Sequence, residues 1–270
     1  MAKILVIGGG AMGSAFTIPC LDNKNNVTIT EPYSKQFINN LKSKNKFHSV
    51  LKIKLPKKLK FRIFSKELLK EKFNLIVIAL SLPGINFISK ELKNIENKTP
   101  ILILTKGLKY DKKRSKILTI SEQIKISTKN KNISVLKGPC LAKELAKKNQ
   151  TKVIIANKNI NIAKKIGKLI STNYYLVEYS TDIIGVEVCS AIKNIYAMVI
   201  GAGQSLNMSS SLFQKSLLEM KYLTKYFNGK ETTVESLAGV GDLYVSAAGG
   251  RNSQTVSYTH LRAHETSRYL

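Results

Sequence analysis

The sequence predicts an α/β protein in which a doubly wound parallel sheet is followed by an all-α domain. Three observations predict this fold class. Short apolar runs of strand length alternate with helical stretches over residues 1–180. Beyond Ile183 the strand pattern fades and two long helical stretches follow. A glycine-rich turn joins the first strand to the first helix, which marks a tight connection between them.

Each element follows from an apolar run bounded by glycine, proline or polar residues. Pro19 is expected to kink or end the first helix, because proline lacks a backbone donor. The predicted strands are Lys3–Ile7, Val27–Thr30, Asn74–Leu80, Ile101–Thr105, Ser134–Lys137, Val153–Ala156 and Tyr175–Glu178. The predicted helices are Ala11–Asp22, Ser34–Lys44, Ile85–Asn94, Ser115–Lys125, Ala142–Lys148, Ile160–Ile170, Val186–Gly203 and Ser209–Phe227.

The composition is that of a globular protein. Of the 270 residues, 43% are hydrophobic and 23% are charged, which excludes a disordered chain. The longest apolar run, Ile76–Leu82, has strand length, and a membrane span needs roughly 18 residues, so no membrane partner is expected. Cys20, Cys140 and Cys189 lack the spacing of a disulfide framework or a zinc site. We therefore expect a cytoplasmic protein without a metal site.

The net charge of +27 raises nucleic acid as a partner. However, 39 of the 44 basic residues are lysines, which are interleaved with asparagine and isoleucine along the chain. A specific nucleic-acid surface concentrates arginine and aromatic residues, and no stretch does so. A general lysine bias therefore explains the charge, and no specific nucleic-acid binding is expected. An electropositive surface still attracts a small anionic substrate.

The first turn has the pattern G-x-G-x-x-G, with glycines at Gly8, Gly10 and Gly13. Gly8 permits the tight turn, Gly10 lets the backbone approach a pyrophosphate, and Gly13 lets the helix pack close to the strand. The N-terminus of the helix supplies free N–H groups for the phosphates. This pattern between a buried strand and a helix indicates a Rossmann-like dinucleotide-binding domain. The alternative is a glycine turn with only a structural role.

Glu31 follows the second strand, eighteen residues after Gly13. A carboxylate near this offset accepts hydrogen bonds from the ribose hydroxyls and repels a 2′-phosphate. The cofactor is therefore expected to be NAD or NADP, with NAD favoured. The alternative is an exposed glutamate at the end of a strand.

The order of elements divides the chain into an NAD(P)-binding domain over residues 1–180 and a partial helical domain over residues 181–252. From Ser253 onwards lysine, isoleucine and asparagine are absent, although they dominate the rest of the chain. We hypothesise that residues 253–270 are foreign, from read-through or a cloning scar. A native polar tail is the alternative, and resequencing the coding DNA distinguishes the two.

Several polar residues follow predicted strands or lie within an apolar helix. Lys106 follows the strand that ends near Leu104, at the sheet edge where ligands bind. Lys193 and Asn194 lie on a helix whose buried course makes unpaired polar groups costly. Arg251 is the best candidate for binding phosphate, because guanidinium binds phosphate oxygens in pairs. Because the chain is rich in lysine, the alternative interpretation of any single lysine is a solvated surface residue without a functional role.

The ordered set of segments resembles the bacterial-type NAD(P)-dependent glycerol-3-phosphate dehydrogenases, from Gly8 through Asn252. The segments that carry the resemblance are the glycine loop, Leu55-Pro56, Thr105-Lys106-Gly107, Gly138-Pro139, Ala142-Lys143-Glu144, Lys193-Asn194 and Gly241-Asp242. This family continues with further helices beyond the point that corresponds to Asn252, so the resemblance implies a C-terminally truncated, incomplete helical domain.

The resemblance implies hydride transfer between a nicotinamide and dihydroxyacetone phosphate, giving sn-glycerol 3-phosphate for glycerophospholipid synthesis. It implies that Lys193 is the catalytic proton donor and acceptor and that Lys106 lies between cofactor and substrate. A small phosphorylated substrate is the implied partner, and a homodimer stays open. The implied substrate contacts are Lys106, Gly138, Cys140, Lys193, Asn194, Asp242, Arg251 and Asn252. The implied cofactor contacts are Gly8, Gly10, Ala11, Met12, Gly13, Glu31, Lys106, Ala142 and Arg251.

Three alternatives stay open at this point. A β-hydroxyacid or sugar-acid dehydrogenase shares the glycine loop but does not need Lys106 and Arg251 around a phosphate. A truncated chain that binds cofactor without catalysis is the second alternative. Nucleic-acid binding is the third, and it predicts a steep salt dependence of affinity for duplexes.

Overall fold

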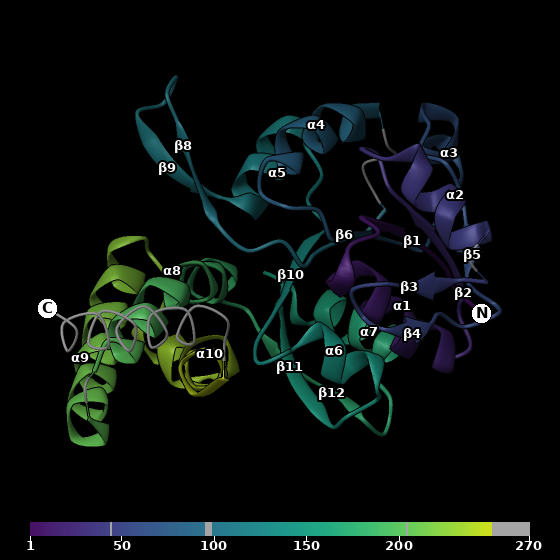
Figure 1. Ribbon diagram of the computed structural model, residues 1–270. Helices are drawn as coiled ribbons and strands as arrows, with labels where there is room; N and C mark the ends of the chain where they lie inside the picture. The colour runs from purple at the N-terminus through teal and green to yellow at the C-terminus, as the bar shows by residue number, and fades with distance from the viewer. Residues whose placement is uncertain (44, 95–98, 204, 250–270) are drawn as a thin grey trace, which may run out of the picture. The chain divides into compact units, whose positions relative to one another are not determined.

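The computed structural model describes residues 1–43, 45–94, 99–203 and 205–249. These residues form two compact units (Figure 1). The first contains residues 1–136 and 140–183, and the second contains residues 137–139 and the chain from Ile184. Arg251, Asn252 and the segment 253–270 lie outside the described residues, so the predictions for them are not addressed by the structure.

The first unit is built on an eight-stranded sheet in the order β12-β11-β10-β7-β6-β1-β2-β5. From β5 to β10 each neighbouring pair is parallel, as is the pair β11–β12, and the order from β5 to β10 is that of a Rossmann sheet. The predicted fold class is therefore confirmed. The sheet strands are β1 (Lys3–Ile7), β2 (Asn26–Thr30), β5 (Lys60–Phe61), β6 (Leu75–Ile78), β7 (Ile101–Ile103), β10 (Ile133–Lys137), β11 (Thr151–Ala156) and β12 (Tyr175–Ser180).

Helices cover the two faces of this sheet. In Figure 1, α4 and α5 lie above strands β1, β6 and β10, and α1, α6 and α7 lie below these three strands. The central strands are buried on both faces, because helices cover both, and their residues are accordingly valine, isoleucine and leucine. The helices are α1 (Ala11–Asp22), α2 (Lys35–Ser43), α3 (Lys66–Lys70), α4 (Gly84–Glu91), η1 (Leu92–Asn94), α5 (Ile120–Thr128), α6 (Ala142–Ala146) and α7 (Ile160–Ile170).

The first helix has its predicted bounds, and one other prediction for local structure is wrong. Pro19 lies inside α1, which continues to Asp22 and is buried along almost its whole length. The predicted helix Ser115–Lys125 is instead a strand followed by the start of α5. An antiparallel hairpin of β8 (Leu108–Asp111) and β9 (Lys116–Thr119) precedes that helix, and Thr119 forms a capping box with Glu122 that starts α5. A second short antiparallel pair joins β3 (Phe47–His48) and β4 (Ile53–Lys54).

The second unit is helical. Its longest elements are α8 (Ile183–Gly201) and α9 (Leu206–Tyr226). Their ends differ by one to three residues from the predicted helices Val186–Gly203 and Ser209–Phe227. Ser205 caps α9 by accepting a hydrogen bond from the backbone N–H of Met208, which accounts for its earlier start. The remaining described elements are η2 (Glu231–Glu235), η3 (Leu237–Gly241) and α10 (Asp242–Gly249).

Helix α8 corrects the expectation that no segment reaches the length of a membrane span. It is 19 residues long with a mean hydropathy of 1.6, so by length and composition it could cross a membrane. A search for unbroken apolar runs misses it because Glu187, Lys193 and Asn194 interrupt the apolar pattern. Of its most apolar window, 61% is buried inside the structure, as in a core helix.

Candidate functional site

The glycine loop follows β1, which lies between β2 and β6 in the sheet. The order in which the chain adds strands reverses direction at β1. The φ angle of Gly8 is +118°, a conformation that side chains rarely adopt. A Cβ on Gly8 would lie 2.5 Å from the carbonyl oxygen of Ala79, the residue after β6. The backbone N–H of Gly8 donates to the carbonyl of Thr30 at 2.8 Å, which ties the loop to the end of β2. Only glycine fits this turn, as the sequence predicts.

Gly10 and Gly13 have opposite surroundings. A Cβ on Gly13 would lie 2.0 Å from the carbonyl oxygen of Gly8, so the missing side chain lets α1 pack against β1. A Cβ on Gly10 would meet no atom within 4 Å, and Gly10 is exposed at the N-terminus of α1. The backbone at the start of α1 is therefore accessible to a ligand phosphate. These residues fit a dinucleotide.

Glu31 lies directly after β2 and faces the glycine loop. One oxygen of its carboxylate accepts a hydrogen bond from the backbone N–H of Gly9 at 2.8 Å, and the other accepts one from Tyr33 at 3.1 Å. A carboxylate has about four acceptor positions, so both oxygens keep the capacity to accept from a ribose hydroxyl. Glu31 thus has a second task, holding the loop, that its spacing alone does not predict.

Two residues that the sequence analysis missed hold the next peptide group, which joins Gly9 to Gly10. Ser14 donates a hydrogen bond to the carbonyl oxygen of Gly9 at 2.8 Å. His48, which is 1% exposed, has Nε2 3.2 Å from the same oxygen, while Nδ1 accepts from the backbone N–H of Leu51. This pairing requires the tautomer with its proton on Nε2. Burial lowers the pKa of His48, which favours this neutral ring. No sequence pattern links His48 to the glycine loop.

The loop after β7 carries Lys106. The hydroxyl of Thr105 donates to the carbonyl of Leu80 at 2.7 Å, which fastens this loop to the one after β6. Gly107 has a φ of +137° and turns the chain away towards β8. Lys106 is half-buried at the carboxyl end of the sheet, where the sequence places it.

Four of the implied contact residues gather on one side of the sheet. Ala11 and Met12 begin α1, Cys140 precedes α6, and Ala142 begins α6. All four are partly buried and pack against the same hydrophobic core. Helices α1 and α6 pack against each other, so segments 130 residues apart in the chain meet near the glycine loop.

The second unit brings Lys193 and Asp242 together. The Nζ atom of Lys193 forms an ion pair with Oδ1 of Asp242 and donates a hydrogen bond to the hydroxyl of Ser246 at 2.7 Å. Lys193 and Asp242 are 6% and 1% exposed. Ser246 lies one turn after Asp242 on α10 and donates to its backbone carbonyl at 2.8 Å. The sequence analysis missed Ser246, and the i, i+4 spacing to Asp242 is the signal that could have found it.

Asn194 does not share this environment. It is exposed on α8, so the expectation that both Lys193 and Asn194 lie on the buried course of the helix is wrong for Asn194. One residue advances a helix by about 100°, which carries the next side chain out of the buried face. Gly138 has a φ of +119°, and the turn that it starts lies against η3, where a Cβ on Gly241 would be 3.7 Å from Pro139.

The sheet order and the glycine loop define a Rossmann-type dinucleotide-binding protein, with a helical unit that holds a buried lysine. The N-terminal domain model of the NAD-dependent glycerol-3-phosphate dehydrogenases matches residues 3–163, and the C-terminal domain model matches residues 182–263. The chain belongs to the NAD-dependent glycerol-3-phosphate dehydrogenase family, a family of oxidoreductases.

Individual relatives agree with this assignment. The chain is 30% identical to a glycerol-3-phosphate dehydrogenase [NAD(P)+] of Clostridium botulinum, over 91% of this chain and 74% of the relative. It is 29% identical to an NADP(+)-dependent glycerol-3-phosphate dehydrogenase of Archaeoglobus fulgidus, over 92% and 77%. A crystal structure of glycerol-3-phosphate dehydrogenase from Coxiella burnetii superposes with a TM-score of 0.84 at 25% identity, covering 96% of this chain and 80% of that one.

Proposed function

We propose that this protein interconverts dihydroxyacetone phosphate and sn-glycerol 3-phosphate by hydride transfer with NAD(P)H. The observation that carries the proposal is the buried ion pair of Lys193 and Asp242, in a chain whose glycine loop fits a dinucleotide. Burying a lysine and an aspartate is costly, and neither is needed to fill a core. A functional ammonium accounts for the pair.

NAD(P)H, when bound at the glycine loop, would supply the hydride for C2 of the ketone. The oxygen at C2 gains negative charge as the hydride arrives, and Nζ of Lys193 stabilises that charge and delivers a proton to it. Asp242 forms an ion pair with the ammonium, and Ser246 fixes the direction of the ammonium by accepting a hydrogen bond from it. Arg251 and Asn252 are proposed to bind the substrate phosphate, which positions the reacting carbon from a distance.

Replacing Lys193 tests the proposal. We expect Lys193→Ala to abolish the oxidation of NADH by dihydroxyacetone phosphate, because the proton donor is lost. Proton transfer alone contributes roughly 10²–10⁴-fold to the rate. Binding of NADH, followed by fluorescence, is expected to stay nearly unchanged, because the glycine loop is untouched.

This single variant leaves Asp242 buried without its cation, which costs about 3–5 kcal/mol. The matched control is therefore Lys193→Met combined with Asp242→Asn, which removes both charges. We expect this double variant to fold, to bind NADH and to remain inactive. A folded Lys193 variant with the kcat of the unaltered protein would show that Lys193 is not the proton donor.

We further propose that NAD is preferred over NADP, which Glu31 supports. Its carboxylate would repel a 2′-phosphate, and the contacts with Gly9 and Tyr33 hold it at the loop. We expect Glu31→Ser to lower the ratio of NADPH to NADH dissociation constants at least about tenfold. Glu31→Gln, which keeps the size but not the charge, is the control that separates repulsion from packing. An unchanged ratio in both variants would contradict the preference.

We also propose a cytoplasmic enzyme that supplies glycerophospholipid synthesis. Its three cysteines, Cys20, Cys140 and Cys189, lack the spacing of a disulfide framework, which suits a reducing compartment. The proposed product, sn-glycerol 3-phosphate, is the backbone of glycerophospholipids. A homodimer is compatible with this role, and sedimentation measures it directly.

A further inference from the structure

We propose that the first unit contains a second binding site, for a small phosphorylated molecule that also carries hydroxyl groups. The site is the pocket between α4, α5 and the β8–β9 hairpin, with a volume of about 600 Å³. This volume lies within the usual range of small-molecule pockets, about 300–1,000 Å³. Neither the glycine loop nor Lys106 lines it, so the inference does not depend on the proposed function.

The lining of this pocket is far more basic than the chain as a whole. Six of its fourteen lining residues are lysine or arginine, and one is acidic. At the chain-wide frequency of 44 basic residues in 270, about two of fourteen would be basic. A general lysine bias therefore does not account for this concentration. The basic residues are Lys90, Lys93, Lys109, Lys112, Lys113 and Arg114.

Most of this positive charge is not neutralised by protein groups. The single acid, Asp111, forms an ion pair with Arg114 at 2.7 Å, and the hydrogen bond from Arg114 lowers the pKa of Asp111. Within the described residues, no carboxylate forms an ion pair with any of the five lysines of the pocket. Five ammonium groups around one pocket can attract and bind a phosphate dianion.

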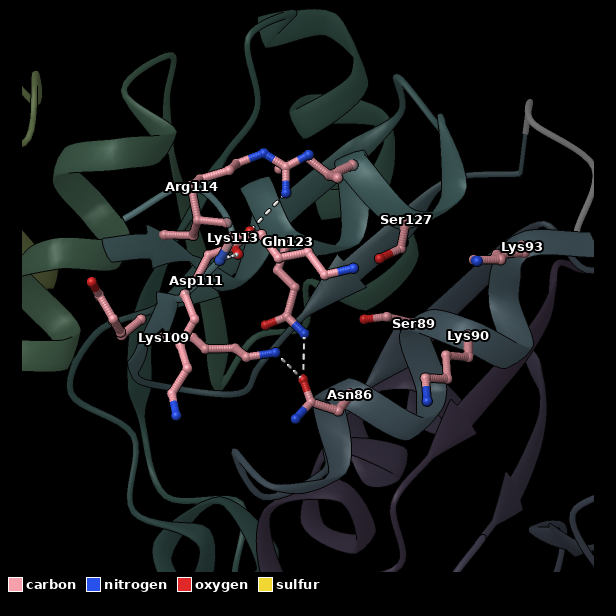
Figure 2. A pocket seen from close by; sticks show the side chains of 14 residues that line it. Asn86, Ser89, Lys90, Lys93, Lys109, Asp111, Lys113, Arg114, Gln123 and Ser127 are labelled. Atoms are coloured by element: carbon pink, nitrogen blue, oxygen red, sulfur yellow. Dashed lines mark hydrogen bonds and ion pairs between the residues drawn. The ribbon is translucent and has the colours of Figure 1, made fainter. Parts of the chain in front are cut away.

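Two buried oxygen atoms of the lining have no hydrogen-bond partner among the residues that the structure describes. They are Oγ of Ser89, whose residue is 2% exposed, and Oε1 of Gln123, whose residue is 8% exposed. A buried polar atom without a partner costs free energy, so each is a position where a ligand would contribute a hydrogen bond. In Figure 2 the hydroxyl of Ser89 points from α4 towards the part of the pocket that Gln123 occupies.

The orientation of Gln123 is set by its neighbours. The ammonium of Lys109 donates to Oδ1 of Asn86, so that oxygen faces the pocket. The amide nitrogen Nε2 of Gln123 donates to the same oxygen at 2.8 Å (Figure 2). Oε1 is therefore left as an acceptor that needs a donor. The phosphoryl oxygens of a phosphate monoester dianion carry no donor, whereas the hydroxyl groups of a phosphorylated polyol supply one.

Titration calorimetry on the full chain tests the site, with inorganic phosphate and glucose 6-phosphate as probes. We expect glucose 6-phosphate to bind more tightly than inorganic phosphate. Lys90→Gln combined with Lys93→Gln is expected to weaken both probes about tenfold or more. Lys164→Gln combined with Lys165→Gln is the matched control, because it removes two exposed charges on α7, outside the pocket. Equal losses in the two double variants would overturn the proposal, since diffuse charge would then explain binding.

A second variant tests the part of the site that recognises hydroxyl groups. Gln123→Met keeps the size of the side chain and removes the acceptor. We expect it to weaken glucose 6-phosphate several-fold and to weaken inorganic phosphate less, because inorganic phosphate has a single hydroxyl group as donor, with thermal unfolding as the check on the fold. No measurable binding of either probe, or binding only to vesicles that contain anionic lipid, would overturn a site for a soluble phosphorylated molecule.

Discussion

The peptide of Gly9 is held by side chains from three different elements. Its N–H donates to Glu31, and its carbonyl oxygen accepts from Ser14 and lies against His48. Glu31 thus holds the peptide group before Gly9, and Ser14 and His48 fix the plane of the one before Gly10, and therefore the direction of the free N–H groups at the start of α1. Glu31 was predictable from its distance to Gly13. His48 was not, because only the folded chain brings it to the loop.

The free energy of unfolding should depend on pH through the titration of His48. Burial lowers its pKa from the ordinary value of 6.5, so the folded state binds a proton less readily than the unfolded state. The stabilisation is present above pH 6.5 and is lost as the pH falls towards the lowered value. We expect His48→Gln, which keeps an N–H donor without titrating, to lose stability less steeply below pH 6.5. Denaturant unfolding of both proteins from pH 8 to pH 5 measures the difference.

The difference between the two proteins in the free energy of unfolding, plotted against pH, reports the titration of His48, because the carboxylates titrate in both proteins. It is limited to about 1.4 kcal/mol for each pH unit. Parallel curves would mean that His48 does not resist protonation in the folded state.

Among the elements, the turn from β1 to α1 was predictable in detail, whereas the region from Leu108 to Thr128 was not. The turn depends on residues that are adjacent in sequence, so its glycines reveal it. In the second region the residues of β9 have helical spacing by chance. Pairing with β8 decides their conformation, because strand pairs form through contacts that local periodicity does not contain.

Two glycines of the turn should respond differently to alanine. Gly10→Ala adds a methyl group to open space, so we expect the free energy of unfolding to change by less than about 1 kcal/mol. The same methyl group occupies the path of a pyrophosphate, so the dissociation constant for NADH should rise at least about tenfold. Calorimetric unfolding and NADH fluorescence measure the two effects.

Gly13→Ala is the matched variant. Its methyl group would lie 2.0 Å from the carbonyl oxygen of Gly8, so we expect a loss of stability of at least about 2 kcal/mol. If both variants lost NADH binding without any difference in stability, the assignment of separate roles to these glycines would be wrong.

Across the whole molecule, the residues proposed for cofactor and for proton transfer belong to different units. The glycine loop, Glu31 and Lys106 lie in the first, and Lys193 and Asp242 lie in the second. The net charge of +27 lies almost entirely in the first unit, because residues 184–270 hold eight basic and six acidic residues, and it acts at long range. An anionic substrate is therefore attracted before it contacts any particular residue.

This attraction predicts a salt dependence of catalysis. Raising sodium chloride from about 20 mM to about 200 mM shortens the screening length from roughly 20 Å to below 10 Å. We expect kcat/KM for dihydroxyacetone phosphate to fall several-fold, while kcat at saturating substrate changes less than about twofold. Steady-state oxidation of NADH measures both constants. A kcat/KM independent of salt would show that net charge has no part in substrate capture.

The alternation of the longer sheet strands with helices, the glycine loop and the position of Lys106 were predictable from the sequence, because each depends on residues within one strand–turn–helix segment. The ion pair of Lys193 with Asp242, the exposure of Asn194 and the contacts of His48 were decided by tertiary packing. These contacts join residues up to 49 positions apart or depend on which helix face is covered. Periodicity describes neighbours along the chain, and burial is determined by whatever distant segment packs against them.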